Sequence, residues 1–226
     1  MKTLAFDIST KMLSIALFDK HGIKDEFHED VGIAHSELLI PTIKAMLERS
    51  GWRIEDIGLA AVGIGPGSFT GLRIAVATVK GLSAGTGIRA VGVPSMDAMA
   101  MCLPGVLEKD VAPLLDARKG KVYSCKYDMS GKAPERISGY MLLTVNELLD
   151  GLERDTVFFG DGVKKYRSEL DKHGLADYIE DIDWYPRATW IGKMGIEKYN
   201  ESSADPDLIE PLYLHAKECN ITQGKG

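Results

Sequence analysis

The amino-acid sequence predicts an α/β protein of two similar lobes, each a mixed β-sheet flanked by helices. Short apolar strands joined by tight turns open the chain, helices and strands then alternate, and the opening pattern returns about halfway along. A length of 226 residues suits one large domain or two small ones, and 45% hydrophobic residues is typical of a globular protein.

The first half begins as an antiparallel meander, because apolar and β-branched runs alternate with polar turn residues. Helical spacing of Leu39 and Ile43 predicts a helix with Ser36 as its candidate N-cap and Gly51 as its stop. A second helix follows a glycine-rich turn and ends near Gly87. Strands are predicted over residues 2–8, 12–19, 22–29, 58–64 and 89–93.

The second half repeats this opening. Aligning LAFDISTKMLSIALFDKHG, which starts at Leu4, with PLLDARKGKVYSCKYDMSG, which starts at Pro113, matches Asp7 to Asp116 without gaps. Aspartate and glycine are common in turns, so chance similarity is the alternative; we favour duplication because it divides the chain into similar halves. Two such lobes around a cleft are the architecture of the actin-like, sugar-kinase and Hsp70 ATPase superfamily, with its RNase H-like sheets.

We expect one lobe over residues 1–102 and the other over residues 103–226. The last segment, about residues 207–226, is a short apolar return that could pack back on the first lobe. The second half should also contain helices over residues 145–152, 163–173 and 188–199 and a strand over residues 156–160.

Composition excludes several classes of protein. A net charge of −6 and a pI near 5.4 argue against a broad basic surface, so an RNA role would need a partner or a local basic patch. Cys102, Cys125 and Cys219 are odd in number and widely spaced, as in a cytosolic protein with reduced thiols. The apolar run at the start is too short for a signal peptide or a membrane span, so we expect a cytoplasmic protein without membrane contact.

The stretch GIGPGSFTGLRIAVATVKGL, residues 63–82, places a glycine-rich turn between a strand and a helix. Backbone N–H groups at Gly65, Gly67 and Ser68 could face a phosphate there. The spacing matches neither the P-loop nor the dinucleotide fingerprint, so a tight structural turn is an equal alternative.

Asp7, Ser9 and Thr10 end the first predicted strand. In a kinase-like cleft the carboxylate would hold a metal-bound water and the hydroxyls would meet phosphates. The alternative, which the short motif alone favours, is a turn that satisfies its own backbone. No histidine pair has metal-binding spacing and no GxSxG motif surrounds Ser68, so a bound metal and serine-hydrolase chemistry are disfavoured.

The second helix has almost no polar side, so it is either internal or part of a subunit interface. Its small residues permit close approach of another helix, whereas Val76 and its neighbours suit the core. We therefore predict that Ala75→Glu breaks an interface and that Val76→Glu unfolds the subunit. The predicted interface residues are Leu39, Ile43, Gly71, Ala75, Thr78 and Leu82.

The long motif closely resembles the signature of the bacterial TsaB family, also called YeaZ. LAFDIST, HSELLIPTI, LLDARKGKVY, GDG and EPLYLHA agree along most of the chain, although His215 replaces an arginine that is common in the family. The resemblance implies an actin-like fold and a role in making N6-threonylcarbamoyladenosine at position 37 of tRNA. It implies a heterodimer with the paralogue TsaD, which carries the transfer site, and a contribution from the ATPase TsaE.

The resemblance also implies that this chain is not the catalytic subunit. Catalytic paralogues have an HxxxH metal pair, and the matching positions here are Ser95 and Met99, which bind hard metals poorly. We therefore expect tRNA contact only through the complex, a homodimer as one option in isolation, no required cofactor and at most weak ATP or ADP binding in a vestigial cleft. The rival hypothesis is an independent ATP-dependent enzyme or a glycoprotease-like peptidase.

Overall fold

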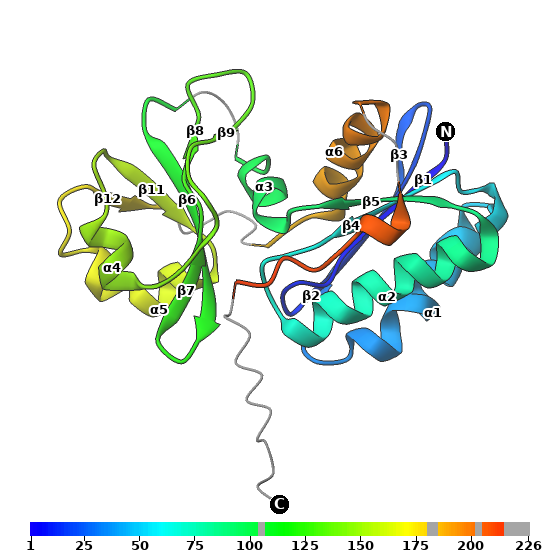
Figure 1. Ribbon diagram of the computed structural model, residues 1–226, viewed down its shortest axis with the longest axis horizontal. Coiled ribbons are helices and arrows are strands. Elements are labelled where there is room, and N and C mark those ends of the chain that lie inside the picture. The colour runs from blue at the N-terminus through cyan, green and yellow to red at the C-terminus, as the bar shows by residue number, and fades with distance from the viewer. Residues whose placement is uncertain (104–106, 180–184, 202–204, 215–226) are drawn as a thin grey trace, which may run out of the picture.

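The computed structural model describes residues 1–103, 107–179, 185–201 and 205–214. These residues form two lobes, each built on its own β-sheet, that lie side by side (Figure 1). No helix among them combines the length and apolar character needed to cross a membrane. Cys102 and Cys125 are free thiols, and Cys219 and His215 lie outside the described residues.

The first lobe holds a sheet with strand order β3-β2-β1-β4-β5. The first three strands pair antiparallel, as tight turns require, whereas β4 and β5 follow helices: β4 pairs parallel to β1, and β5 pairs parallel to β4. The strands are β1 Thr3–Asp7, β2 Met12–Asp19, β3 Gly22–Asp30, β4 Leu59–Gly63 and β5 Arg89–Val93, and the helices on one face are α1 His35–Arg49 and α2 Phe69–Thr86, with a 3-10 turn at Ile54–Asp56.

The second lobe holds a sheet of seven strands with main order β10-β7-β6-β11-β12, to which β8 and β9 are added. Its strands are β6 Asp110–Arg118, β7 Lys121–Ser124, β8 Tyr127–Asp128, β9 Glu135–Arg136, β10 Met141–Thr144, β11 Thr156–Phe159 and β12 Ala176–Tyr178. Helices α4 Val145–Asp150 and α5 Asp161–Leu170 share one apolar cluster with this sheet.

The two sheets have matching topology. In each, an antiparallel hairpin, β1–β2 or β6–β7, is extended on one side by an antiparallel strand and on the other by two parallel strands. This correspondence supports the duplication that the sequence predicts, and it places Asp7 and Asp116 at comparable points of the two hairpins.

The predicted strands and the longer helices are present within a few residues of their expected bounds. Ser36 is not the N-cap of α1, because the helix begins at His35 after Ala34 and has no side-chain cap. Helix α3 Ser95–Ala100 and strands β9, β10 and β12 were not predicted, because all four are too short to show a clear period.

Helix α6 Ala188–Glu201 covers the face of the first sheet opposite α1 and α2 (Figure 1). Gly192 and Gly195 allow this contact. A Cβ at Gly192 would overlap the Phe18 ring, and a Cβ at Gly195 would overlap the side chain of Ala61. The chain thus returns to the first lobe at α6, earlier than the predicted residue 207. The 3-10 turn Pro206–Leu208 contacts α2 and β5, and residues 215–226 lie outside the described residues.

Helix α3 lies between the lobes and belongs to both cores (Figure 1). Ala98 packs in an apolar cluster with the first sheet and α6, whereas Met96 and Met99 pack in a cluster with the second sheet. This short helix therefore joins the two hydrophobic cores.

Candidate functional site

Asp7 ends β1 and lies inside the first lobe, with 1% of its surface exposed. Its Oδ1 accepts hydrogen bonds from the backbone N–H of Ser9 at 2.8 Å and from the Ser9 hydroxyl at 2.7 Å. Its Oδ2 accepts a hydrogen bond from the Ser95 hydroxyl at 2.5 Å. Burial raises the pKa of Asp7, while these hydrogen bonds lower it. Both carboxylate oxygens are therefore engaged by donors of the chain itself.

Ser95, at the start of α3, also connects Asp7 to the glycine-rich turn. Its hydroxyl accepts a hydrogen bond from the N–H of Gly65 at 3.0 Å, and its own N–H donates to the Gly65 carbonyl at 2.8 Å. The side chain of Ser95 is fully buried. Asp7, Ser9, Gly65 and Ser95, here named the buried brace, thus join the end of β1, the turn after β4 and the start of α3.

Two glycines let the turn approach the buried brace closely. A Cβ at Gly63 would overlap the Asp7 carboxylate, and a Cβ at Gly67 would overlap the Ser9 carbonyl. The N–H of Ser68 donates to that same carbonyl at 2.7 Å. The glycine-rich turn is therefore packed against the β1–β2 turn, and some of its backbone N–H groups already donate hydrogen bonds within the chain.

All six predicted cleft residues gather at this point of the first lobe. Asp7, Ser9, Gly65 and Gly67 make the contacts described above. The hydroxyl of Thr10 accepts a hydrogen bond from the N–H of Met12, and the hydroxyl of Ser68 accepts one from the N–H of Gly71 and so caps α2. These are contacts of turns that satisfy their own backbone, the alternative that the sequence left open. Nucleotide binding here stays a prediction.

Ser95 and Met99 stand where the family resemblance places a metal-binding histidine pair. Both residues are buried. Ser95 hydrogen-bonds Asp7 and Gly65, and Met99 packs in the apolar core of the second lobe. A hydroxyl and a thioether are a poor donor set for a hard metal ion. Within the described parts of the chain, no group of three His, Cys, Asp or Glu residues could hold a metal.

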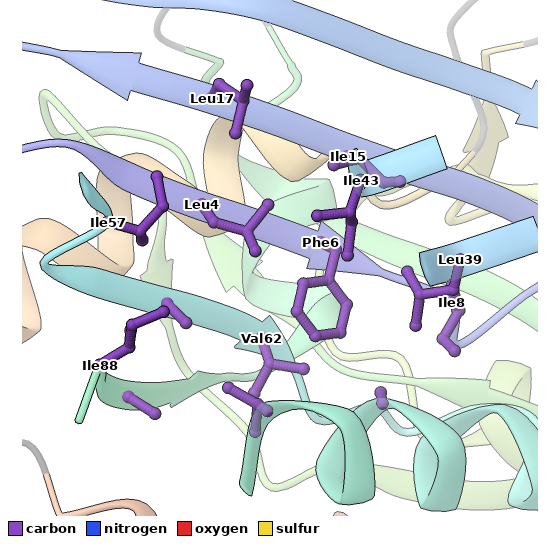
Figure 2. Packing of buried hydrophobic residues seen from close by; sticks show 14 of the residues in the cluster. Leu4, Phe6, Ile8, Ile15, Leu17, Leu39, Ile43, Ile57, Val62 and Ile88 are labelled. Carbon is purple, nitrogen blue, oxygen red and sulfur yellow. The ribbon is translucent and has the colours of Figure 1, made fainter. Parts of the chain in front are cut away.

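Four of the predicted interface residues are covered by the chain's own first lobe. Leu39 and Ile43 point from α1 toward Phe6 on the sheet, and both are less than 5% exposed (Figure 2). Ala75 is fully buried in the same cluster, and a Cβ at Gly71 would overlap the backbone of β1's end. The prediction that these four residues face a partner is wrong, because they fill the space between the helices and the sheet.

The solvent face of α2 lies beside the face that was predicted to form the interface. Arg73, Ala77, Gly81, Ala84 and Gly85 are exposed, and a Cβ at either glycine would meet nothing within 4 Å. Ala and Gly occur on both faces of this helix, so residue size alone could not identify the exposed one. Thr78 and Leu82 are half-buried at the border of this face, and their role in an interface stays a prediction.

Sequence reasoning missed an aromatic pair at the start of α2. Phe69 is 58% exposed, its ring centroid lies 5.1 Å from that of Tyr213, and the Arg73 guanidinium lies 5.1 Å from the Phe69 ring. Tyr213 is itself 43% exposed. A phenylalanine directly after an N-cap serine was an available signal, because that position of a helix usually faces solvent.

A second polar cluster, also missed, connects α3 to the second lobe. Asp97 accepts hydrogen bonds from the hydroxyls of Tyr127 at 2.6 Å and Tyr140 at 2.8 Å. Burial and the negative charge of Asp97 raise the pKa of both tyrosines, so both remain neutral donors. With the Ser95–Asp7 contact, this cluster fixes α3 to both lobes.

Sequence comparison identifies relatives of this chain. The family model for TsaD, tRNA N6-adenosine threonylcarbamoyltransferase, matches residues 26–184. Relatives from several bacteria carry the name tRNA threonylcarbamoyladenosine biosynthesis protein TsaB. The Haemophilus influenzae protein is 32% identical over 93% of this chain and 92% of its own length. The Bacillus subtilis protein is 27% identical over 97% of this chain and 96% of its own length. For Escherichia coli the identity is 34%, over 56% of this chain and 55% of the relative.

Solved structures establish the fold. YeaZ from Pseudomonas aeruginosa superposes with a TM-score of 0.80 at 23% identity, covering 94% of this chain and 99% of that one. The activator of 2-hydroxyisocaproyl-CoA dehydratase from Clostridium difficile, solved with bound ADPNP, superposes with a TM-score of 0.53 at 11% identity. The match covers 94% of this chain and 100% of that one. The two-lobed actin-like fold predicted from the sequence is therefore confirmed. The family-model match and the full-length similarity to the Haemophilus influenzae relative show that this chain belongs to the TsaB family, also called YeaZ.

Proposed function

We propose that this chain is a non-catalytic subunit of the assembly that makes N6-threonylcarbamoyladenosine at position 37 of tRNA, where it pairs with the paralogue TsaD and activates it. Membership of the TsaB family supports the part in tRNA threonylcarbamoyladenosine biosynthesis. TsaE completes the assembly, and this chain meets tRNA within the complex.

The observation that carries the non-catalytic role is the buried brace. Asp7 is the carboxylate that a nucleotide-cleaving cleft would need, and both of its oxygens are held by Ser9 and Ser95 at 1% exposure. Ser95 and Met99 offer no metal site. A carboxylate that is buried and hydrogen-bonded on both oxygens supports a structural role, in which it holds the backbone in place.

The solvent face of α2 supports the pairing with TsaD. Ala77 and Gly81 would let a partner helix approach closely, and the exposed Phe69 and Tyr213 rings offer apolar area at one end of the same face. In the absence of TsaD the same face could join two copies of this chain. No nucleotide is required for this role, and weak ATP or ADP binding would be detected by calorimetry with and without TsaD.

Reconstitution tests the proposal. Modification of a tRNA transcript is measured with this chain, TsaD, TsaE and a synthase that makes threonylcarbamoyl-adenylate, and each protein is then left out in turn. We expect modification to fall to background without this chain and to be absent when this chain and threonylcarbamoyl-adenylate are the only additions. Modification by this chain alone, or full modification without it, would contradict the proposal.

Two alanines on α2 test the surface. Ala77→Glu places a charge on the exposed face and should abolish co-elution with TsaD without altering the melting temperature of the isolated chain. Ala75→Glu, two residues away, buries a charge and should unfold the chain instead. Ser168→Glu adds the same charge to the exposed side of α5 and should co-elute with TsaD as wild type does. Co-elution of Ala77→Glu would exclude this face.

A further inference from the structure

The turn between β6 and β7 has an uncommon backbone. Arg118, Lys119 and Gly120 follow one another with φ of 63°, 48° and 75°. Glycine, asparagine and aspartate adopt this left-handed region readily, whereas arginine and lysine do so at a cost of about 1 kcal/mol each. Arg118 and Lys119 are the non-glycine residues with positive φ in the described part of the chain. A cheaper residue would make the same turn, which points to a role for the charged side chains beyond turn formation.

Cations are concentrated at this turn. The side chains of Arg118, Lys119 and Lys121 are exposed, and no salt bridge to them occurs among the residues that the structure describes. On α5, Lys164 is exposed and Lys165 donates to Asp116 Oδ1, the atom that also accepts the N–H of Arg118. We name Arg118, Lys119, Lys121, Lys164 and Lys165 the basic turn.

The acidic groups around the basic turn do not cancel its charge. Asp116 is shared by Lys165 and the backbone of Arg118. Glu147 is held by Thr144 in the capping box of α4, and the charge of Lys121 lowers its pKa slightly further. Burial raises the pKa of Asp161. The five cations outnumber the three carboxylates of Asp116, Glu147 and Asp161, so the basic turn is positively charged on a chain whose net charge is −6.

We propose that the basic turn binds the phosphate backbone of tRNA within the assembled complex. This inference rests on the proposed function, in which TsaD presents tRNA beside this chain. A protein partner would be expected to require apolar area, and none of the exposed large hydrophobic residues lies on the basic turn. Long cations with no exposed large hydrophobic side chain among them fit a polyanion. In Figure 1 the turn lies at the lower end of the second lobe, on the side where α2 begins.

The test uses the double variant Arg118→Asn/Lys119→Asn in the complete complex with TsaD. Asparagine suits the left-handed backbone, so the melting temperature should not fall while two charges are removed. Binding of an unmodified tRNA transcript is measured over a range of salt concentrations. We expect about tenfold weaker binding at physiological salt and a slope of log affinity against log salt that is lower by about 1–2.

A matched control separates a local site from net charge. Lys20→Asn/Lys24→Asn removes two exposed cations from the β2–β3 hairpin of the first lobe and should change affinity less than twofold. Equal weakening by the control, or unchanged affinity and slope in the Arg118/Lys119 variant, would overturn the inference.

The inference and the proposed function can fail separately. If TsaD modifies tRNA fully without this chain, the proposed function fails. If wild-type chain is required but the double variant supports modification with an unchanged KM for tRNA, only the basic turn is excluded. The expected result is a raised KM for tRNA with an unchanged kcat.

Discussion

In both lobes, the aspartate near the end of the first hairpin strand accepts a hydrogen bond from the N–H two residues on: Asp7 from Ser9 in the first lobe and Asp116 from Arg118 in the second. The surroundings differ. Asp7 is 1% exposed and its second oxygen is held by Ser95, whereas Asp116 is half-buried and binds the exposed Lys165. One turn has become a structural connection inside the protein, and its counterpart still presents charge to solvent.

The neighbours of each turn explain the difference. Gly63 lets the backbone of β4 touch the Asp7 carboxylate, and Ser95 brings α3 onto it. At the second turn, α5 supplies a lysine instead, which reaches the carboxylate from the surface. We therefore assign the hairpin of the first lobe to stability and propose surface recognition for its counterpart in the second lobe.

The largest expected effect follows from filling the space beside Asp7. Gly63→Ala would place a methyl group on the buried carboxylate in a strand that cannot move away, so we expect a loss of roughly 3 kcal/mol in the free energy of unfolding. Urea denaturation measures this. Gly81→Ala, on the exposed face of α2, should instead gain up to about 1 kcal/mol. Equal stability of Gly63→Ala and wild type would mean that the brace is loosely packed.

Removing the shared hydroxyl should have the next largest effect. Ser95→Ala leaves Asp7 Oδ2 and the N–H of Gly65 without their partner in a buried site, at a cost of about 2 kcal/mol. Lys165→Met removes the corresponding contact of the second turn. Its side chain is 45% exposed, so the loss should be under about 1 kcal/mol. The difference between the two denaturation midpoints measures how differently the turns are used, and equal losses would contradict the comparison.

A graded effect of pH should also distinguish the turns. Because the folded-state pKa of Asp7 is raised, the folded state holds its proton more tightly than the unfolded state does. The Asp7 contribution to stability therefore falls as pH rises from the ordinary aspartate value to the raised one, and an electrostatic contribution from His28 opposes the rise in the pKa of Asp7. Denaturation of wild type and Asp7→Asn across pH 3 to 8 should show this slope in the wild type and its loss in the variant. Parallel curves would contradict it.

The smallest expected effect is a gain. Lys119→Asn relieves the left-handed backbone of an exposed residue, so stability should rise by about 0.5 kcal/mol. Thermal unfolding of the isolated chain measures it. A loss would show that the lysine side chain supports the fold, and the functional interpretation of the basic turn would weaken with it.

Local patterns were enough to predict the strands of the first sheet and, in the second sheet, the β6–β7 hairpin and β11. The alternation of apolar runs with residues such as Lys20 and Gly22 marks each turn, and the alignment of Asp7 with Asp116 predicts the repeat. The predicted cleft residues also lie together, because a strand end and a glycine-rich turn of a mixed sheet meet at one edge. Their use in a closed hydrogen-bond network depends on Ser95, which lies far along the chain.

Faces and long-range returns could not be predicted in the same way. Ala75 and Ala77 are the same residue type on opposite sides of α2, and only the position of the sheet decides which is buried. The return of α6 to the first lobe depends on Gly192 fitting against Phe18, a contact between distant segments. Hydrophobic periodicity indicates that a helix has a buried side, but it does not identify the element that covers that side.

Activity of the assembled complex with Asp7→Asn tests the central claim most directly. The amide keeps the size of the carboxylate and can still hydrogen-bond Ser9 and Ser95, so the variant should fold, which urea denaturation must first establish. If the first turn is a structural brace, the complex should modify tRNA at a rate within about threefold of wild type. A fall of several hundredfold in a folded variant, equivalent to about 3–4 kcal/mol of transition-state stabilisation, would show that Asp7 takes part in the reaction and would contradict the account.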